Sequence, residues 1–210
     1  MKKPDSIIFD MDGTLWDPTD LYLQAWNSGL KKSDIDRTLT AEELKPLMGV
    51  NGKSAMELLF PSDTDKVRQQ IADTVNQQRW ELIKQGGGTL YPGVLEGLKE
   101  LSKNHKLFIV SNCSKGTIAL FMERAGINAF ITDEMAYGVN LMPKHHNMHL
   151  LIDKYQLQTP IYVGDTDIDR VESEKAGIPF VYVSYGFAIA KRFDLSFSNF
   201  HSLTQHFTNL

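Results

Sequence analysis

The chain alternates between short apolar runs and longer segments in which apolar residues recur at helical spacing. The apolar runs are rich in branched or aromatic residues, and each is ended by glycine or a polar residue, which predicts buried strands. These runs cover residues 6–9, 106–110, 129–131, 160–163 and 180–183. Helical spacing between the later runs predicts helices over residues 94–102, 116–125 and 147–155. Such alternation indicates crossover connections, and therefore an α/β fold with a doubly wound, mostly parallel sheet.

The interval from residue 17 to residue 88 breaks this alternation. It contains no convincing strand, and its apolar spacing predicts helices over residues 21–30, 41–48, 53–59 and 63–85. Asp17-Pro18-Thr19 and Gly86-Gly87-Gly88 mark its two ends and are candidate hinges. We therefore expect a helical cap of residues 17–88, inserted after the first strand of a Rossmann-like core that residues 1–16 and 89–210 form.

Composition narrows the class of protein. The chain is 42% hydrophobic and 23% charged, as in ordinary globular proteins. Its 22 basic and 26 acidic residues leave a net charge of −4, which argues against nucleic-acid binding. The single cysteine, Cys113, cannot form an intrachain disulfide. No apolar run is long enough for a signal peptide or a membrane span, so we expect a cytoplasmic monomer or small homo-oligomer with no membrane partner.

Polar residues with candidate chemistry follow the predicted strands at the edge where open α/β sheets bind ligands. They are Asp10, Asp12, Gly13 and Thr14 after the first strand, Ser111 and Asn112 after the second, and Asp165, Asp167 and Asp169 after the fourth, with Lys144 ahead of that fourth strand. Two carboxylates about 4 Å apart repel by roughly 4 kcal/mol at an effective dielectric near 20. A hard cation removes this cost, and Mg²⁺ suits the set because it also leaves positions for phosphate oxygens and water.

The remaining groups of this set suit a phosphoryl group. The Ser111 hydroxyl, the Lys144 ammonium and backbone amides near Gly13 supply donors and positive charge. Asp10 is a suitable nucleophile because a carboxylate is ionised at neutral pH without a separate base. Asp12 can protonate the departing alkoxide and then take a proton from water.

Two polar residues of the set have open roles, and a third is assigned to structure. Thr14 either binds phosphate or caps the turn, and Asn112 either binds phosphate or satisfies backbone groups. Asp167 is interpreted as a helix-start residue.

Taken in order, the motifs "DMDGT", "SN", the lysine of "LMPKHHN", "GDTDID" and "KAGIPFVYVSYG" resemble the haloacid dehalogenase superfamily, in particular its phosphatases with a helical cap. The segments "YPGVLEGLKEL" and "AGIPFVYVSYG" resemble the phosphoglycolate phosphatase-like members. The resemblance covers nearly the whole chain. The first motif together with the last is specific, whereas the serine and the lysine alone are weak signals.

Roles carried over from the resemblance fall on residues already singled out. It implies that Asp10 is the nucleophile and a metal ligand, and that Asp12 is the acid/base with its backbone carbonyl on Mg²⁺. It also implies that Ser111 binds phosphate and that Lys144 bridges nucleophile and phosphate. Finally, it implies that Asp165 ligates the metal and that Asp169 holds either metal-bound water or Lys144. Two features depart from the family pattern. Glu172 stands where relatives often carry a small residue, and the pair His145-His146 follows Lys144.

We therefore expect a Mg²⁺-dependent phosphatase that hydrolyses a small phosphorylated metabolite through a phospho-aspartate. The alternatives are a sugar-phosphate mutase, which shares the chemistry up to that intermediate, and a non-catalytic phosphometabolite-binding or receiver-like module. Receivers do not carry the DxDGT motif on the first strand.

Several further residues carry weaker expectations. Lys53, in the cap segment "LMGVNGKSAM", is a candidate for recognising an anionic group on the substrate. His145, His146 and His149 are expected on a solvated helix face, and Trp16, Tyr22 and Trp26 in the core of the cap.

Overall fold

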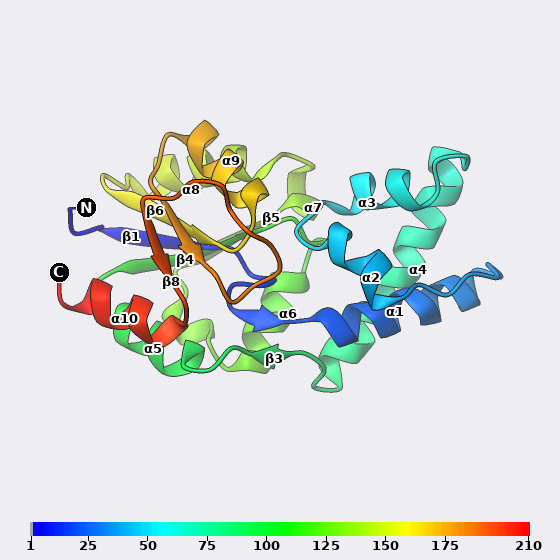
Figure 1. The fold of residues 1–210 in the computed structure, drawn as a ribbon, viewed down its shortest axis with the longest axis horizontal. Coiled ribbons are helices and arrows are strands. Elements are labelled where there is room, and N and C mark those ends of the chain that lie inside the picture. The colour runs from blue at the N-terminus through cyan, green and yellow to red at the C-terminus, as the bar shows by residue number, and fades with distance from the viewer. Residues whose placement is uncertain (1) are drawn as a thin grey trace.

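A six-stranded sheet lies between two layers of helices in the computed structural model, which describes residues 2–210 (Figure 1). The strand order is β5-β4-β1-β6-β7-β8, and every neighbouring pair is parallel. The strands are β1 (Ser6–Phe9), β4 (Lys106–Ser111), β5 (Asp133–Ala136), β6 (Pro160–Gly164), β7 (Phe180–Val183) and β8 (Leu195–Phe197). The predicted α/β fold with a doubly wound parallel sheet is confirmed.

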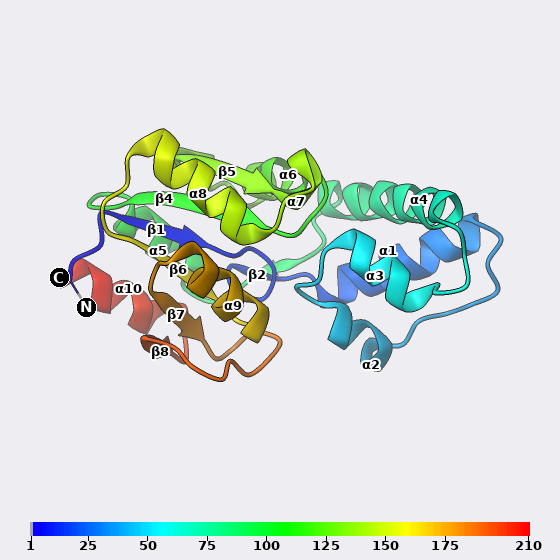
Figure 2. The same cartoon turned by 90° about the horizontal axis from the view of Figure 1, so that it is seen from above.

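Alternating side chains of β1 reach the two helical layers. Ile7 and Phe9 belong to the apolar cluster that includes residues of α5 (Val94–Leu101), α6 (Thr117–Ala125) and α10 (Phe200–Thr208). Ile8 belongs to the opposite cluster, which includes residues of α8 (Lys144–Tyr155) and α9 (Asp167–Ala176) (Figure 2). Successive side chains of a strand point to opposite faces, so a strand covered on both faces is apolar throughout.

The cap, which we define as residues 17–88, is helical and lies beyond the carboxyl ends of the strands (Figure 1). Its elements are α1 (Thr19–Lys32), α2 (Ala41–Leu44), the 3-10 helix η1 (Lys45–Leu47), α3 (Gly52–Leu59) and α4 (Asp65–Lys84). Gly29 allows α1 and α4 to approach closely, because a Cβ there would lie 2.9 Å from the Cα of Val75. The helix predicted over residues 41–48 is broken, since Pro46 lacks the N–H that would continue α2. The division of the chain into two domains at the cap boundaries stays a prediction.

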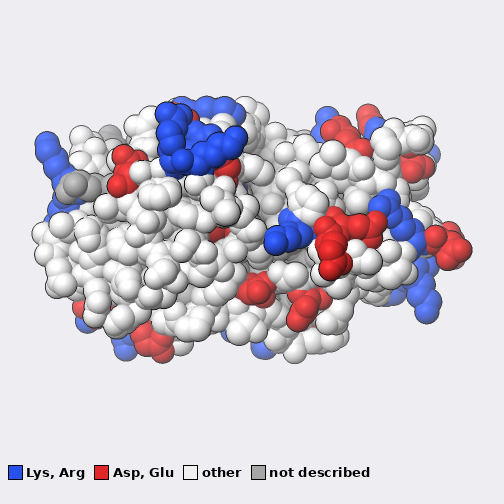
Figure 3. Space-filling model, viewed as in Figure 1, with Lys and Arg blue, Asp and Glu red and all other residues white. Residues whose placement is uncertain are grey.

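On the face shown in Figure 3, Lys and Arg side chains gather in one patch at the top of the core, positive and negative side chains are mixed over the cap, and much of the remaining face is uncharged. Among the helices of residues 2–210, none combines the length and the apolar character that crossing a membrane requires.

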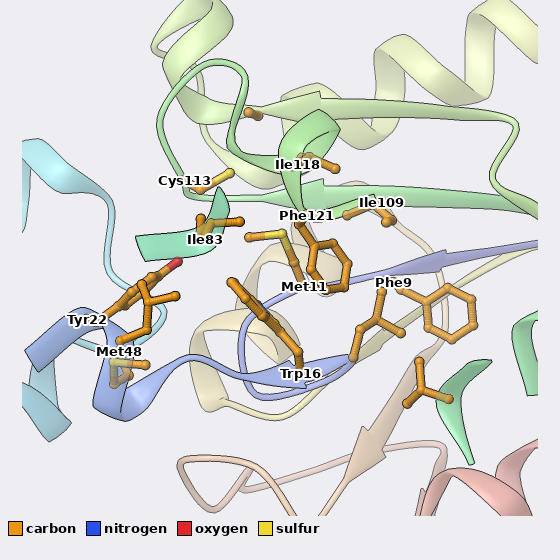
Figure 4. Packing of buried hydrophobic residues seen from close by; sticks show 14 of the residues in the cluster. Phe9, Met11, Trp16, Tyr22, Met48, Ile83, Ile109, Cys113, Ile118 and Phe121 are labelled. Atoms are coloured by element: carbon orange, nitrogen blue, oxygen red, sulfur yellow. The ribbon is translucent and has the colours of Figure 1, made fainter. Parts of the chain in front are cut away.

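A short antiparallel pair connects cap and core. It consists of β2 (Trp16–Asp17) and β3 (Thr89–Leu90), which are too short to show in the apolar pattern. The Trp16 ring packs against Phe121 of the core, with centroids 4.8 Å apart, and against the edge of the Tyr22 ring at 6.5 Å (Figure 4). Cap and core therefore share one continuous apolar cluster.

The strand predicted over residues 129–131 is wrong. The 3-10 helix η2 (Asn128–Phe130) occupies this segment, and Phe130 and Ile131 pack against the core from it. The actual strand, β5, has the sequence DEMA and, within residues 2–210, pairs with β4 alone. An edge strand that is only half-buried does not need an apolar run, which is why its sequence gave no signal. The opposite edge strand, β8, is also half-buried and was missed for the same reason.

Replacing Gly88 by alanine should destabilise the fold more than the same change at Gly126. Both glycines have a positive φ, +82° and +68°, which costs an L-residue about 1–2 kcal/mol. A Cβ at Gly88 would also overlap the Trp16 ring, whereas one at Gly126 would meet nothing within 4 Å. Overlap in a packed site adds about 1–3 kcal/mol. Urea unfolding of the two variants measures the difference, and equal losses of stability would contradict the packing role of Gly88.

Candidate active site

Three neighbouring strands bring the predicted site residues to one edge of the sheet. Asp10 directly follows β1, Ser111 ends β4 and Asp165 directly follows β6. Since β1 lies between β4 and β6, these ends are adjacent. All three side chains are buried, and the Asp10 N–H donates to the carbonyl of Val163 at 2.8 Å. Residues far apart in the sequence therefore meet at the position where open α/β sheets bind ligands.

Lys144 connects two of the buried carboxylates. It is the first residue of α8, and its side chain is 2% exposed. Its Nζ lies 2.7 Å from Asp10 Oδ1 and 2.7 Å from Asp169 Oδ1. Burial alone would lower the pKa of this ammonium, but the two carboxylates outweigh burial and raise the pKa. Lys144 is therefore charged and fixed in place.

The carboxylates of Asp165 and Asp169 are oriented by their own segment of the chain. Asp169 Oδ2 accepts hydrogen bonds from the N–H of Thr166 at 3.0 Å and from its hydroxyl at 2.6 Å, which forms a capping box at the start of α9. Asp165 Oδ2 accepts from the N–H of Phe187 at 2.7 Å. These bonds hold both side chains toward Asp10.

The acid cluster fits a divalent cation. Carboxylate oxygens of Asp10, Asp165 and Asp169 lie within 4.8 Å of one another, and Asp10 Oδ2 is buried with no hydrogen-bond partner among residues 2–210. Burial raises the pKa of Asp10 well above its usual range despite the nearby Lys144, and burial together with Asp169 raises that of Asp165 to about 7. One lysine cannot balance three carboxylates, so an orphaned carboxylate oxygen here suits a hard cation such as Mg²⁺.

Asp12 is held apart from this cluster. Its Oδ1 accepts from the indole N–H of Trp16 and its Oδ2 from the hydroxyl of Tyr22, each at 2.7 Å. Burial raises the pKa of Asp12, and these two hydrogen bonds limit the rise. Trp16, Tyr22 and Trp26 are buried as expected. Sequence reasoning missed that Trp16 and Tyr22 also fix the Asp12 carboxylate, although both follow it closely and have polar tips.

Gly13 and Thr14 form a tight turn after Asp12, and both lie against Asp165. Gly13 has φ +84°, and a Cβ there would overlap the Asp165 carboxylate, so only glycine fits. Its N–H donates to the carbonyl of Trp16 at 2.9 Å and is not available to phosphate. The hydroxyl of Thr14 donates to Asp165 Oδ1 at 3.3 Å. The hydroxyl of Thr14 and the missing side chain at Gly13 thus both serve the Asp165 carboxylate, and the phosphate-binding role of these residues stays a prediction.

The backbone of Asp12 is free of the turn's hydrogen bonds. In the bridge between Asp12 and Trp16, the bonds use the carbonyl of Met11 and the N–H of Gly13. Within residues 2–210, neither the N–H nor the carbonyl of Asp12 has a hydrogen-bond partner. These two groups can therefore serve an anion and a cation, respectively.

A cavity of about 890 Å³ lies between the site and the cap helices α3 and α4. Asp10, Asp12, Ser111, Asn112 and Lys144 line it on the core side, and residues of α3 and α4 line it on the cap side. Its size is in the range of small-molecule binding sites.

The cap contacts the core beside this cavity. The side-chain amide of Asn112 donates to the carbonyl of Gly49 at 2.8 Å, and the Trp80 indole donates to the hydroxyl of Thr117 at 3.1 Å. Asn112, a candidate phosphate ligand, therefore links the core to the cap through its amide nitrogen.

Among the three histidines expected on a solvated face, His149 is exposed, whereas His145 is partly buried against Glu172. His145 Nδ1 lies 2.7 Å from Glu172 Oε2, and His149 Nε2 lies 3.1 Å from the carbonyl of Ala176. The same Glu172 oxygen accepts from the backbone N–H of His145 at 3.0 Å, which satisfies a free N–H in the first turn of α8. Glu172, the departure from the family pattern, thus anchors the turn that carries Lys144.

Three other residues lie away from the acid cluster. Lys53 lines the cavity with a side chain that is 71% exposed, and its Nζ lies 4.0 Å from Glu57. Asp167 begins α9 and pairs with Arg170 at 2.6 Å, as expected for a helix-start residue. Cys113 is buried, and burial raises the pKa of its thiol to about 12, which makes it inert.

The parallel sheet, the buried acid cluster at its carboxyl edge and the helical insertion together define an α/β protein of the hydrolase type. The chain belongs to the haloacid dehalogenase-like hydrolase family, whose model matches residues 7–183. This confirms the resemblance that the motifs indicated.

Individual relatives share the same overall organisation. A phosphoglycolate phosphatase of Rhodobacter capsulatus is 23% identical over 87% of this chain and 85% of its own length. The pyrophosphatase PpaX of Listeria monocytogenes is 26% identical over 84% of this chain and 83% of its own. The crystal structure of a "predicted phosphoglycolate phosphatase" from Haemophilus somnus superposes with a TM-score of 0.83 at 21% identity, covering 98% of this chain and 99% of that one.

Mg²⁺ should stabilise the protein against heat, and this stabilisation should weaken as the pH falls below about 7. The pKa of Asp165 without metal is about 7, so lowering the pH protonates this carboxyl, and the proton competes with the metal. Thermal unfolding with and without Mg²⁺, at about pH 6 and about pH 8, measures the effect. Asp165→Asn should abolish it, whereas Asp153→Asn, at an exposed position of α8, should not. A shift in unfolding temperature that is equal at both pH values would contradict the assignment.

Proposed function

We propose that the protein is a Mg²⁺-dependent phosphatase that hydrolyses small phosphate monoesters through a phospho-aspartate on Asp10. The main support for this proposal is the arrangement of the two oxygens of the Asp10 carboxylate. Lys144 holds Asp10 Oδ1 at 2.7 Å, while Oδ2 is buried at the cavity without a protein partner among residues 2–210. Lys144 therefore fixes one oxygen of Asp10, and the other oxygen is free to attack phosphorus.

The groups around Asp10 are suited to binding a phosphoryl group. The Lys144 ammonium and the Ser111 hydroxyl are donors at the cavity floor, and the free N–H of Asp12 adds a third. Mg²⁺ held by Asp10, Asp165 and the Asp12 carbonyl would neutralise the carboxylates and polarise the phosphoryl oxygens. Asp169 keeps Lys144 in place through its 2.7 Å contact, which is one of the two roles that the family resemblance implies.

Asp12 supplies the proton transfers. In the first step Asp10 attacks phosphorus, and Asp12 gives its proton to the departing alkoxide oxygen. In the second step Asp12 takes a proton from the water that attacks phosphorus, and Asp10 is released as a carboxylate. Burial raises the pKa of Asp12, which increases the protonated fraction that the first step needs. The hydrogen bonds from Trp16 and Tyr22 keep this carboxylate at the cavity wall.

Hydrolysis is favoured over the alternatives. The names of the relatives, a phosphoglycolate phosphatase and a pyrophosphatase, favour transfer to water over the mutase outcome. Membership of a hydrolase family argues against a receiver-like module. The cytoplasmic location and the monomeric or small homo-oligomeric state stay predictions.

Asp10→Asn should lower Mg²⁺-dependent turnover of p-nitrophenyl phosphate by at least about 10³-fold, because the amide is a poor nucleophile. Asp20→Asn, at an exposed position of α1, is the matched control and should retain activity. Acid quenching of the wild-type enzyme with labelled substrate should trap phosphate on the protein, and Asp10→Asn should trap none. With a hexose 1-phosphate, release of inorganic phosphate supports a phosphatase, and formation of the isomeric sugar phosphate supports a mutase. Activity that survives Asp10→Asn or metal removal would refute the proposal.

A further inference from the structure

Arg79 of α4 lines the cavity and has no hydrogen-bond or ion-pair partner among residues 2–210. Its guanidinium carbon lies 4.2 Å from the centroid of the Tyr22 ring, and its Nε is buried without an acceptor in that part of the chain. A guanidinium stacked on a ring keeps its N–H donors free at its edges. Leaving such a donor buried and unsatisfied is unfavourable, so the site is suited to an external acceptor.

The other arginines show that this state is unusual in the chain. Arg37, Arg68, Arg170 and Arg192 each pair with at least one carboxylate, and Arg124 is exposed to solvent. Arg68 also lines the cavity, but Asp65 occupies its guanidinium at 2.7 Å. Arg79 is therefore the partly buried arginine of residues 2–210 that lacks an anionic partner.

The position of Arg79 is close to the catalytic groups without contacting them. It stacks on Tyr22, whose hydroxyl donates to Asp12 Oδ2 at 2.7 Å. Its positive charge also acts to lower the pKa of Asp12, against the effect of burial. A ligand group bound by Arg79 would thus lie on the cap side of the cavity, while a phosphoryl group at Asp10 and Lys144 would lie on its floor.

We propose that Arg79 binds a second oxyanion on the substrate, a carboxylate or a further phosphate, so that the substrates are phosphate esters with two acidic groups. This inference rests on the proposed phosphatase function, because it places the transferred phosphoryl group at Asp10. A planar guanidinium binds either oxyanion through two parallel hydrogen bonds.

Arg79 meets this role better than Lys53, the cap residue that the sequence suggested. The Lys53 side chain is 71% exposed and lies near Glu57, so water screens its charge. The Nε of Arg79 is buried, and a charge-assisted hydrogen bond is stronger where water is excluded.

Three substrates of matched length test the proposal: a short alkyl phosphate, the same chain ending in a carboxylate, and the same chain ending in a second phosphate. The wild-type enzyme should prefer the diacids in kcat/KM. Arg79→Met, which keeps an apolar stem on Tyr22, should reduce this preference by about 10- to 100-fold, mainly through KM. Arg79→Lys should restore part of it. The two diacids distinguish a carboxylate site from a phosphate site.

Two variants serve as controls for charge in the cavity. Arg68→Met and Lys53→Met should each leave the ratio of kcat/KM values, diacid over alkyl phosphate, within about twofold of the wild type. A selective loss in Lys53→Met instead of Arg79→Met would overturn the assignment. An equal loss for all three substrates in Arg79→Met would also overturn it, because Arg79 would then act only by supporting Tyr22 and Asp12.

Binding of non-hydrolysable phosphonates separates this inference from the proposed function. Phosphonoacetate should bind the wild-type protein with Mg²⁺ at least about tenfold more tightly than ethylphosphonate, and Arg79→Met should remove the difference. This result would support the anion site even if no phosphate ester were hydrolysed, an outcome that would refute only the phosphatase. Equal affinity of both phosphonates for the wild-type protein would refute the anion site.

Discussion

The site depends on the two ion pairs that the buried ammonium of Lys144 makes with Asp10 and Asp169. The ammonium nitrogen lies 2.7 Å from one oxygen of Asp10 and 2.7 Å from one oxygen of Asp169, at a point where three carboxylates converge. Without it the cluster would hold uncompensated negative charge in a region of low dielectric, which costs several kcal/mol per ion. Its placement in turn depends on the first turn of α8, which the Glu172 carboxylate anchors by accepting the N–H of His145. A residue that departs from the family pattern therefore supports Lys144.

Much of the fold was predictable because β1, β4, β6 and β7 are covered on both faces. Burial on both faces requires continuous apolar runs, and the polar residues that end these runs fall at one edge by topology alone. That is why Asp10, Ser111 and Asp165 could be grouped from sequence. The edge strands β5 and β8 gave no such signal, because a half-buried edge strand tolerates polar residues such as Asp133 and Glu134.

The finer geometry of the site was not predictable because it depends on the direction of side chains in a tight turn. Gly13 and Thr14 are close to Asp10 in sequence, yet the positive φ of Gly13 directs both toward Asp165. The same turn leaves the backbone of Asp12 free and directs its carboxylate to Trp16 and Tyr22. The sequence motif identified these residues. Which of them contacts its surroundings through the side chain and which through the backbone depends on the dihedral angles of the turn, and the motif does not specify those angles.

On the proposed function, the cap would contribute to chemistry as well as to enclosure, because Tyr22 contacts both Arg79 and Asp12. One side of its ring stacks under Arg79, and its hydroxyl donates to Asp12. An anion bound at Arg79 would reduce the positive charge near Asp12, and the loss of that charge raises the pKa of a carboxyl. Occupation of the cap side of the cavity would thereby favour the protonated Asp12 that the departing alkoxide needs. If both proposals hold, the stacked ring would couple binding of the substrate's second acidic group to the proton transfer at its phosphate ester.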